Sequence, residues 1–438
     1  MKPKCLVKPL AARLLPLLSL LLPLISPLPA AAVVASPAIE VLFVGNSYTF
    51  GRVDPVMGYN AANVHDLTAG FNALNPAGTN SYPVGTAGQG WFEPHPWGGV
   101  PGVFKKMTDE AGLNYDVSLS TRNAVSLRGQ FLNTANSTWD LRGNVASQAW
   151  DKVVLQEQSG AALPAGKGKN ANLATFNAYA DQFERFIHNG AAQAYTETTL
   201  FGSLAACTAT GLSAASCGLT RSIPANSFAN ASTQVYLEQS WARPDMVEAH
   251  KITTPNKTTA DGRPIVDTST AGGAAMLYYS NLAGMSTDLH NAFDGKPATN
   301  AGFTGVVPVG DAFQRAVDAG LAAGSGFYDT NGITQEPASG LLNLWWLDRT
   351  HASKYGSYLS ALTLFGSLTG LDPQTLGAAE QAAADLGISS SDAVLLQRVA
   401  AAQLGFATPV PEPAQAALLL AGLPLLGAQL RRKAGAGR

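Results

Sequence analysis

Residues 39–47 read Ile-Glu-Val-Leu-Phe-Val-Gly-Asn-Ser. The run from Ile39 to Val44 is rich in β-branched and aromatic residues, which is typical of a buried strand, and Gly45 and Asn46 then end it in a turn. Similar short runs occur at 115–120, 152–156 and 234–238, and helical patterns lie between them at 100–112 and 172–189. Short strands that alternate with helices predict a central parallel sheet with helices on both faces, that is, a three-layer α/β/α domain.

The composition excludes two broad classes of protein. Of 438 residues, 46% are hydrophobic, which is too much apolar content for an intrinsically disordered chain. The chain carries 28 basic and 30 acidic side chains, so it lacks the basic excess with which nucleic-acid-binding proteins meet phosphates. Charged residues make up only 13%, about half of the usual share of roughly 25%. This balance suits a protein that works outside the cytoplasm.

Residues 1–35 have the order of a secretory signal peptide. Four basic residues come first, an apolar stretch runs from Leu14 to about Leu28, and small residues follow at 29–35. We expect cleavage near Ala32 or Ala35. The alternative, an anchor that stays in the membrane, is disfavoured because the apolar stretch is short and broken by prolines.

The C-terminal residues 409–433 have three ordered parts. Val410-Pro411-Glu412-Pro413 precedes an apolar run at 414–430, and Arg431-Arg432-Lys433 follows it. This order resembles the PEP-CTERM sorting signal of Gram-negative bacteria. The resemblance implies cleavage by a membrane exosortase, a link to extracellular polysaccharide, and a location in the periplasm, at the cell surface or in the extracellular matrix. The alternative is a plain C-terminal membrane anchor, since the apolar run is close to the minimum length of a spanning helix.

Two long segments interrupt the alternation of strands and helices. Residues 51–99 and 200–231 are longer than ordinary connections, so we expect them to be surface insertions around a site. The second contains Cys207 and Cys217, which we expect to form a disulfide in an oxidising compartment, with free buried thiols as the alternative. Residues 371–408 predict a C-terminal extension of short helices.

Three polar residues have the chemistry of a hydrolase. Ser47 follows the first strand, at the carboxyl edge where open α/β sheets place their ligands. Asp348 and His351 are three residues apart, so a single turn can bring the carboxylate to the imidazole, whose other nitrogen then takes a proton from a serine. The alternative for this pair is a helix cap and an exposed histidine. Asp288 and His290 form a rival pair, which we expect to be a loop.

The order of Gly-Asn-Ser after the first strand and Asp-x-x-His near the end resembles the SGNH hydrolases, the GDSL-type lipase and esterase superfamily, over about residues 36–370. The resemblance implies a flavodoxin-like α/β/α fold and no cofactor. It also implies that Ser47 is the nucleophile, His351 the base and Asp348 its orienting partner. The runs at 155–159, 239–243 and 308–313 resemble an uncharacterised branch of the same superfamily.

The resemblance also implies an oxyanion hole, and here the sequence departs from the family. Gly129 is the expected glycine of the second conserved block. Where the third block has Gly-x-Asn, this chain reads Leu155-Gln156-Glu157-Gln158-Ser159, so Gln158 (or Gln156) would have to supply the side-chain amide. A missing donor costs roughly 100–1,000-fold in turnover.

These observations predict an exported serine esterase that acts on an acylated small molecule or on O-acetyl groups of an extracellular polysaccharide. The expected partners are that substrate and an exosortase-type processing enzyme, with no nucleic acid and with membrane contact only through the sorting helix. The alternative is a non-catalytic carbohydrate-binding or matrix protein, in which Trp91 and Trp97 would stack on sugars. The histidines show no metal-binding spacing, so no metal site is predicted.

Overall fold

The structure is a computed structural model that describes residues 37–70, 95–135, 140–251, 257–258, 264–265, 276–338 and 340–406. Contacts divide the chain into two units, Met1–Pro37 and Ala38–Arg438, and the second contains everything described below. The expected signal peptide, the sorting segment 409–433 and Trp91 lie outside the described residues. Within the described residues, no helix is both long and apolar enough to cross a membrane.

A six-stranded sheet in the order β10-β7-β4-β1-β3-β2 forms the centre of the second unit, and all of its pairings are parallel. The four strands expected from the sequence are confirmed as β1 Ile39–Gly45, β3 Tyr115–Thr121, β4 Lys152–Gln156 and β7 Gln234–Glu238. The two strands that were not expected lie at the edges, β2 His65–Asp66 and β10 Phe303–Val307. β1 is buried from Val41 to Gly45 because it has a neighbour on each side.

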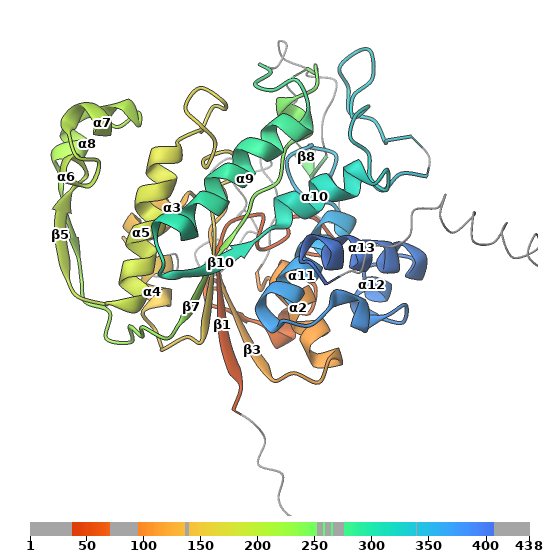
Figure 1. Ribbon diagram of the computed structural model, residues 1–438, viewed down its shortest axis with the longest axis horizontal. Helices are drawn as coiled ribbons and strands as arrows, with labels where there is room; N and C mark the ends of the chain where they lie inside the picture. The colour runs from red at the N-terminus through yellow and green to blue at the C-terminus, as the bar shows by residue number, and fades with distance from the viewer. Residues whose placement is uncertain are drawn as a thin grey trace, which may run out of the picture. The chain divides into compact units, whose positions relative to one another are not determined.

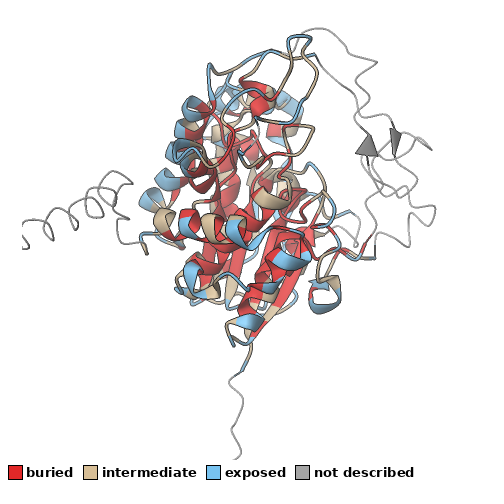
Figure 2. Cartoon of the chain, turned by 90° about the vertical axis from the view of Figure 1, so that its right-hand side faces the viewer, coloured by how far each residue is buried: buried red, intermediate tan, exposed pale blue. Residues whose placement is uncertain are grey.

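Helices cover both faces of the sheet, which confirms the three-layer α/β/α fold (Figure 1). One face carries α3 Leu127–Leu132, α4 Leu141–Val145 and α5 Leu173–His188, and α9 Leu282–Thr299 packs on α5 through Phe293 and Phe176. The other face carries α2 Gly99–Glu110, α11 Lys354–Thr369 and α13 Ser390–Gln403, with α10 Val309–Asp318 packed against the last two. The sheet is a buried layer, and exposed residues lie on the outer sides of the helices (Figure 2).

Helix α11 is buried along most of its length, because its sequence from Tyr358 to Phe365 is almost continuously apolar and it lies between α2, α10 and α13. Ser353 caps its N-terminus by accepting from the N–H groups of Tyr355 and Gly356. Burial and the cap fix the position of the residues just before the helix, which include His351. The residues after α11 form η5 Pro373–Leu376, α12 Gln381–Asp385 and α13.

The segment after α5 forms an arm beside the sheet. Strands β5 Gln193–Thr196 and β6 Thr220–Ile223 pair antiparallel, and between them lie α6 Glu197–Leu200, α7 Leu204–Ala209 and α8 Ala214–Gly218. The predicted disulfide between Cys207 and Cys217 is confirmed. The smaller remaining elements are η1 Ala61–Asn63, η3 Pro244–Met246 and the strand pair β8 Lys257–Thr258 and β9 Pro264–Ile265.

Candidate active site

The turn after β1 holds Ser47 at the carboxyl edge of the sheet. Gly45 is required there because a Cβ on it would lie 2.1 Å from Thr49 Oγ1. Asn46 fixes the turn from both sides, since its N–H donates to Gln156 Oε1 (3.1 Å) and its Nδ2 donates to the carbonyl oxygen of Val125 (3.1 Å). The helices that follow the neighbouring strands β1 and β4 lie on opposite faces of the sheet. The carboxyl edge between two such strands is the place where open α/β sheets bind ligands.

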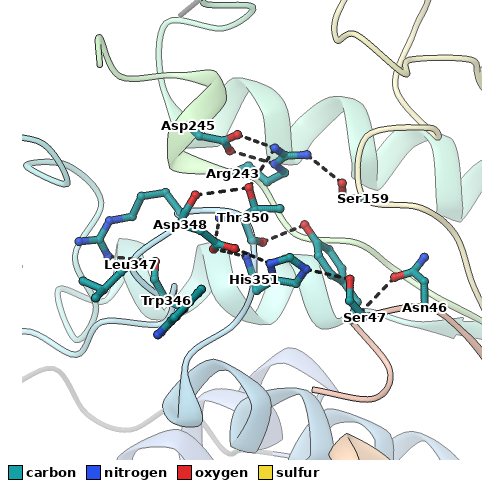
Figure 3. A network of polar contacts seen from close by, with 12 residues as sticks. Asn46, Ser47, Ser159, Arg243, Asp245, Trp346, Leu347, Asp348, Thr350 and His351 are labelled. Atoms are coloured by element: carbon teal, nitrogen blue, oxygen red, sulfur yellow. Dashed lines mark hydrogen bonds and ion pairs between the residues drawn. The ribbon is translucent and has the colours of Figure 1, made fainter. Parts of the chain in front are cut away.

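The structure brings Ser47 and His351 together across 304 positions of sequence. Ser47 Oγ lies 2.8 Å from His351 Nε2, and His351 Nδ1 lies 2.5 Å from Asp348 Oδ2 (Figure 3). A serine hydroxyl, an imidazole and a carboxylate in this order form the hydrogen-bonded chain that activates a serine nucleophile. Ser47 and His351 are 5% and 8% exposed, so the chain of hydrogen bonds is shielded from bulk water.

A tight loop fixes the direction of the Asp348 carboxylate. Its Oδ1 accepts hydrogen bonds from the backbone N–H groups of Thr350 (3.0 Å) and His351 (2.9 Å), so Oδ2 is left for the imidazole. Arg349 lies between Asp348 and Thr350. Its φ is +56°, a conformation that costs free energy for a residue with a Cβ. Its fully buried guanidinium offsets this cost by donating to Thr334 Oγ1 and to several backbone carbonyl oxygens.

Burial and charge set the protonation states of the pair. Burial alone would raise the pKa of Asp348, but the charge and hydrogen bonds of His351 and the N–H of Thr350 hold that pKa well below its usual range. Burial lowers the pKa of His351 and the cations Arg52 and Arg243 lower it further, against the opposing effect of Asp348. An ionised Asp348 and a neutral His351 are the states that a general base requires.

Arg243 connects two loops of the site. Its Nη2 donates to Thr350 Oγ1 (3.0 Å) and its Nη1 donates to Ser159 Oγ (2.8 Å), while Asp245 accepts from the same guanidinium through both carboxylate oxygens. Figure 3 shows this network beside the imidazole. Sequence reasoning noted the run at 239–243 but assigned no role to Arg243.

A pair of stacked rings supports the same loop from another side. The carbonyl oxygen of Thr350 accepts hydrogen bonds from Tyr48 Oη (2.9 Å) and Trp241 Nε1 (3.1 Å). The rings of Tyr48 and Trp241 are stacked with centroids 3.8 Å apart. Since Tyr48 follows Ser47 directly, this contact links the turn that holds Ser47 to the loop that carries His351.

Two of the expected oxyanion donors are engaged elsewhere. Gly129 lies inside α3, and its N–H donates to the N-cap Ser126 Oγ (3.3 Å), so the prediction that it supplies an oxyanion N–H does not fit the structure. Gln156 is buried under the turn that holds Ser47, where its Oε1 accepts from Asn46 and its Nε2 donates to the carbonyl oxygen of Glu157. Gln158 is half-buried at the end of β4, so it remains as the amide candidate.

The backbone at Ala124 is unusual, and the sequence did not point to it. Ala124 follows β3, has φ of +55°, and lies next to Val125, whose carbonyl oxygen binds Asn46. Glycine adopts this left-handed backbone conformation most easily. The position therefore has the backbone of a glycine, although the residue is an alanine. No sequence pattern singles out an alanine with such a backbone.

The other candidates from the sequence have different surroundings. Asp288 and His290 lie inside helix α9, so the expectation of a loop there was wrong. Asp288 accepts from Tyr279 Oη (2.8 Å), whereas His290 Nδ1 lies 2.8 Å from Asp311, so the rival pair does not form. Trp97 is 3% exposed and stacks between Phe50 and His95, which leaves no ring face for a sugar. Trp345 is a core residue that is 1% exposed. In the described part of the chain, no group of acidic, histidine or cysteine side chains could hold a metal ion.

Neither a family model nor a curated protein matches this sequence. Among solved structures, the chain is similar to a DUF4886 family protein from Bacteroides uniformis, with 13% identity, 86% of this chain and 99% of that chain covered, and a TM-score of 0.40. It is also similar to a protein described as a putative SGNH hydrolase from Slackia heliotrinireducens, with 14% identity, coverage of 76% and 100%, and a TM-score of 0.32.

Proposed function

We propose that this protein is a serine esterase in which Ser47 is the nucleophile, His351 the general base and Asp348 its orienting partner. One observation carries the proposal. Ser47 Oγ, the His351 ring and the Asp348 carboxylate form one continuous chain of hydrogen bonds of 2.8 and 2.5 Å. Its members come from two loops that are far apart in sequence, and the Arg243 contacts brace one of these loops.

The chemistry follows from this geometry. His351 Nε2 takes the proton from Ser47 as Oγ attacks the acyl carbonyl, and the same nitrogen then gives that proton to the leaving alcohol. Water releases the acyl group in a second step of the same kind. The charge on the carbonyl oxygen would be met by the N–H of Ser47, the amide of Gln158 and the backbone at Ala124, which replaces Gly129 in this scheme.

We also propose that the protein acts outside the cytoplasm, on O-acetyl groups of an extracellular polysaccharide. The support for this step is the order of residues 1–35 and 409–433, which resemble export and sorting signals. The burial of Trp97 removes one of the two aromatic residues on which the alternative, a non-catalytic sugar-binding protein, depended.

The test compares the wild-type protein with Ser47→Ala and His351→Ala on p-nitrophenyl acetate and acetylated xylan. We expect turnover that falls by at least 1,000-fold in both variants. Ser147→Ala is a matched control, because Ser147 is exposed and precedes β4 at the opposite edge of the sheet.

A fluorophosphonate probe provides a second readout that does not depend on the choice of ester. It should label wild-type protein at Ser47 and should not label Ser47→Ala. A folded wild-type protein that neither turns over an ester nor reacts with the probe would disprove the esterase proposal.

A further inference from the structure

A cavity of about 430 Å³ lies at the carboxyl ends of β3 and β4. It is bounded by the residues that follow β3, the residues that follow β4, the first turn of α5 and the tip of the β5–β6 arm. We call it the polar cavity, after the hydrogen-bonding side chains in its wall, which include Ser126, Glu157, Gln158, Lys169, Asn170 and Thr210.

A hydrogen bond connects the wall of the polar cavity to the turn that holds Ser47. Asn46, which precedes Ser47, donates to the carbonyl oxygen of Val125, and the residues on either side of Val125 both line the cavity. Glu157 joins the two inner walls, because its Oε1 accepts from the N–H groups of Leu127 (3.0 Å) and Gln158 (2.5 Å). An ester carbonyl held at Ser47 and Gln158 would therefore have one of its two substituents directed into the cavity.

The lining indicates which substituent that is. An acyl chain of several carbons needs an apolar wall, because polar groups that lose water without a new hydrogen bond cost free energy. The polar cavity instead offers amides, hydroxyls and charged groups at Gln158, Asn170, Thr210 and Lys169. Most ligand sites are lined mainly by apolar groups, so this wall favours a ligand with a hydroxyl on nearly every carbon.

The buried carboxyl group of Glu157 fits such a ligand. Glu157 is 1% exposed, and burial raises its pKa to about 8 against the opposing effect of its two backbone hydrogen bonds. At neutral pH the group is therefore protonated, so it can donate to a hydroxyl oxygen without placing a negative charge in the site.

The β5–β6 arm forms the outer wall. Thr210 and Leu212 line the cavity, and the carbonyl oxygen of Thr210 accepts from Asn172 Nδ2 at the N-terminus of α5 (2.7 Å). Both lining residues lie inside the loop that the Cys207–Cys217 disulfide closes. The arm thus gives the cavity a wall that is attached to the domain and cross-linked within itself.

We propose that the polar cavity binds the sugar residue that carries the ester, so that the alcohol part of the substrate is a carbohydrate and the acyl part is small. This inference rests on the proposed esterase function. Its own content is the place in the structure where the sugar binds, and this can be tested by binding alone.

The test measures binding of acetylated xylo-oligosaccharides to the full-length Ser47→Ala protein by titration calorimetry. Lys169 and Asn170 are exposed, so Lys169→Ala with Asn170→Ala should leave the fold intact. Added to Ser47→Ala, this pair should weaken binding at least tenfold, because each lost hydrogen bond to a sugar removes a contact that water does not fully replace. Lys167→Ala, two residues away and exposed but outside the cavity wall, is the control and should bind as the parent does.

A kinetic comparison separates this inference from the proposed function. In the wild-type background, the Lys169→Ala and Asn170→Ala pair should lose at least ten times more kcat/KM on acetylated xylo-oligosaccharides than on p-nitrophenyl acetate. Equal losses on both esters, or unchanged oligosaccharide binding in the variant, would overturn the cavity inference while Ser47-dependent turnover would still support the esterase. Cavity-dependent binding without any Ser47-dependent turnover would support the sugar site and reject the esterase.

Discussion

The Asp348 carboxylate is held by three hydrogen bonds, two from backbone N–H groups and one from His351. In Asp348→Asn, the amide would oppose the Nδ1–H of the imidazole and favour the tautomer that cannot accept the Ser47 proton. We therefore expect kcat on p-nitrophenyl acetate to fall by about 10³–10⁴, as in serine proteases with the equivalent change, with little effect on KM. Steady-state kinetics at pH 7.5 measure both constants.

Asp318→Asn is the matched control for this variant. Asp318 ends α10 and accepts from Gln314, away from the Ser47 hydrogen bonds, so its loss should leave both constants unchanged. If Asp348→Asn keeps more than a tenth of the wild-type kcat, Asp348 does not orient the base.

The surroundings of His351 predict the acid side of the pH profile. Because burial and the cations Arg52 and Arg243 lower the pKa of His351, kcat/KM should rise with pH through an apparent pKa below 6.5 and become level above it.

Arg243→Gln removes one of these cations, so the rising part of the pH profile should move to higher pH, whereas Arg243→Lys should keep its wild-type position. A purely structural role for Arg243 would lower the plateau in both variants and leave the rising part in place.

The strands that the sequence predicts have either a short apolar run, as β1, β4 and β7 do, or alternating apolar residues, as β3 does. Lys152–Gln156 and Gln234–Glu238 are short, but they are rich in β-branched and aromatic residues, and both are central strands. β10 was missed because Thr304 and Gly305 interrupt its apolar character, which an edge strand tolerates. Helix α9 contains Pro297 and many polar residues, so its pattern does not resemble an amphipathic helix.

Motifs located the residues of the proposed Ser47–His351–Asp348 triad, but contacts between distant segments could not be predicted. Ser47, Asp348 and His351 occur in short sequence motifs, Gly-Asn-Ser and Asp-x-x-His, that can be recognised without a structure. Gly129 was a wrong choice because an N-cap serine three residues earlier takes its N–H. The hydrogen bonds of Arg243 to Ser159 and Thr350 reach two loops that are 84 and 107 positions away, and nothing near Arg243 in the sequence indicates these two contacts.

The Cys207–Cys217 disulfide is an element-scale feature, because it closes a loop within one arm. Closing about ten residues stabilises such a loop by about 3 kcal/mol through the entropy of the open chain. In a Cys207→Ser, Cys217→Ser double variant, we expect amide exchange across 204–218 to accelerate about 100-fold, as measured by hydrogen exchange with mass spectrometry.

Helix α5 serves as the internal control in that experiment, since its exchange should not change. The melting temperature of the domain should move by only a few degrees, because the arm contributes little to the core around the sheet. Exchange in 204–218 that stays at the wild-type rate would mean that other contacts of the arm, such as the ion pairs of Glu197 with Arg128 and Arg221, hold it in place of the disulfide.

At the scale of the whole molecule, the carboxyl ends of the strands concentrate polar groups in a buried place. Ser47 follows β1, Glu157 follows β4, and Glu238 ends β7, so the same edge that carries the proposed chemistry contains two carboxyl groups that are each 1% exposed. Burial raises the pKa of Glu157 and of Glu238 to about 8. As pH rises, these two carboxyl groups ionise more easily in the unfolded chain than in the folded protein, so the free energy of unfolding falls.

Glu238 allows this cost to be measured without disturbing the site hydrogen bonds, because its carboxylate oxygens have no hydrogen-bond partner among the residues that the structure describes. Its pKa is about 8 in the folded protein and about 4.5 in the unfolded chain, so the free energy of unfolding should fall as pH rises from about 4.5 to about 8. Glu238→Gln does not titrate. The difference in free energy of unfolding, Glu238→Gln minus wild type, should therefore increase by a few kcal/mol from pH 5 to pH 8. Urea unfolding at both pH values measures the gain, and exposed Glu336→Gln should show none. Parallel pH curves for wild type and Glu238→Gln would mean that Glu238 is already ionised in the folded protein.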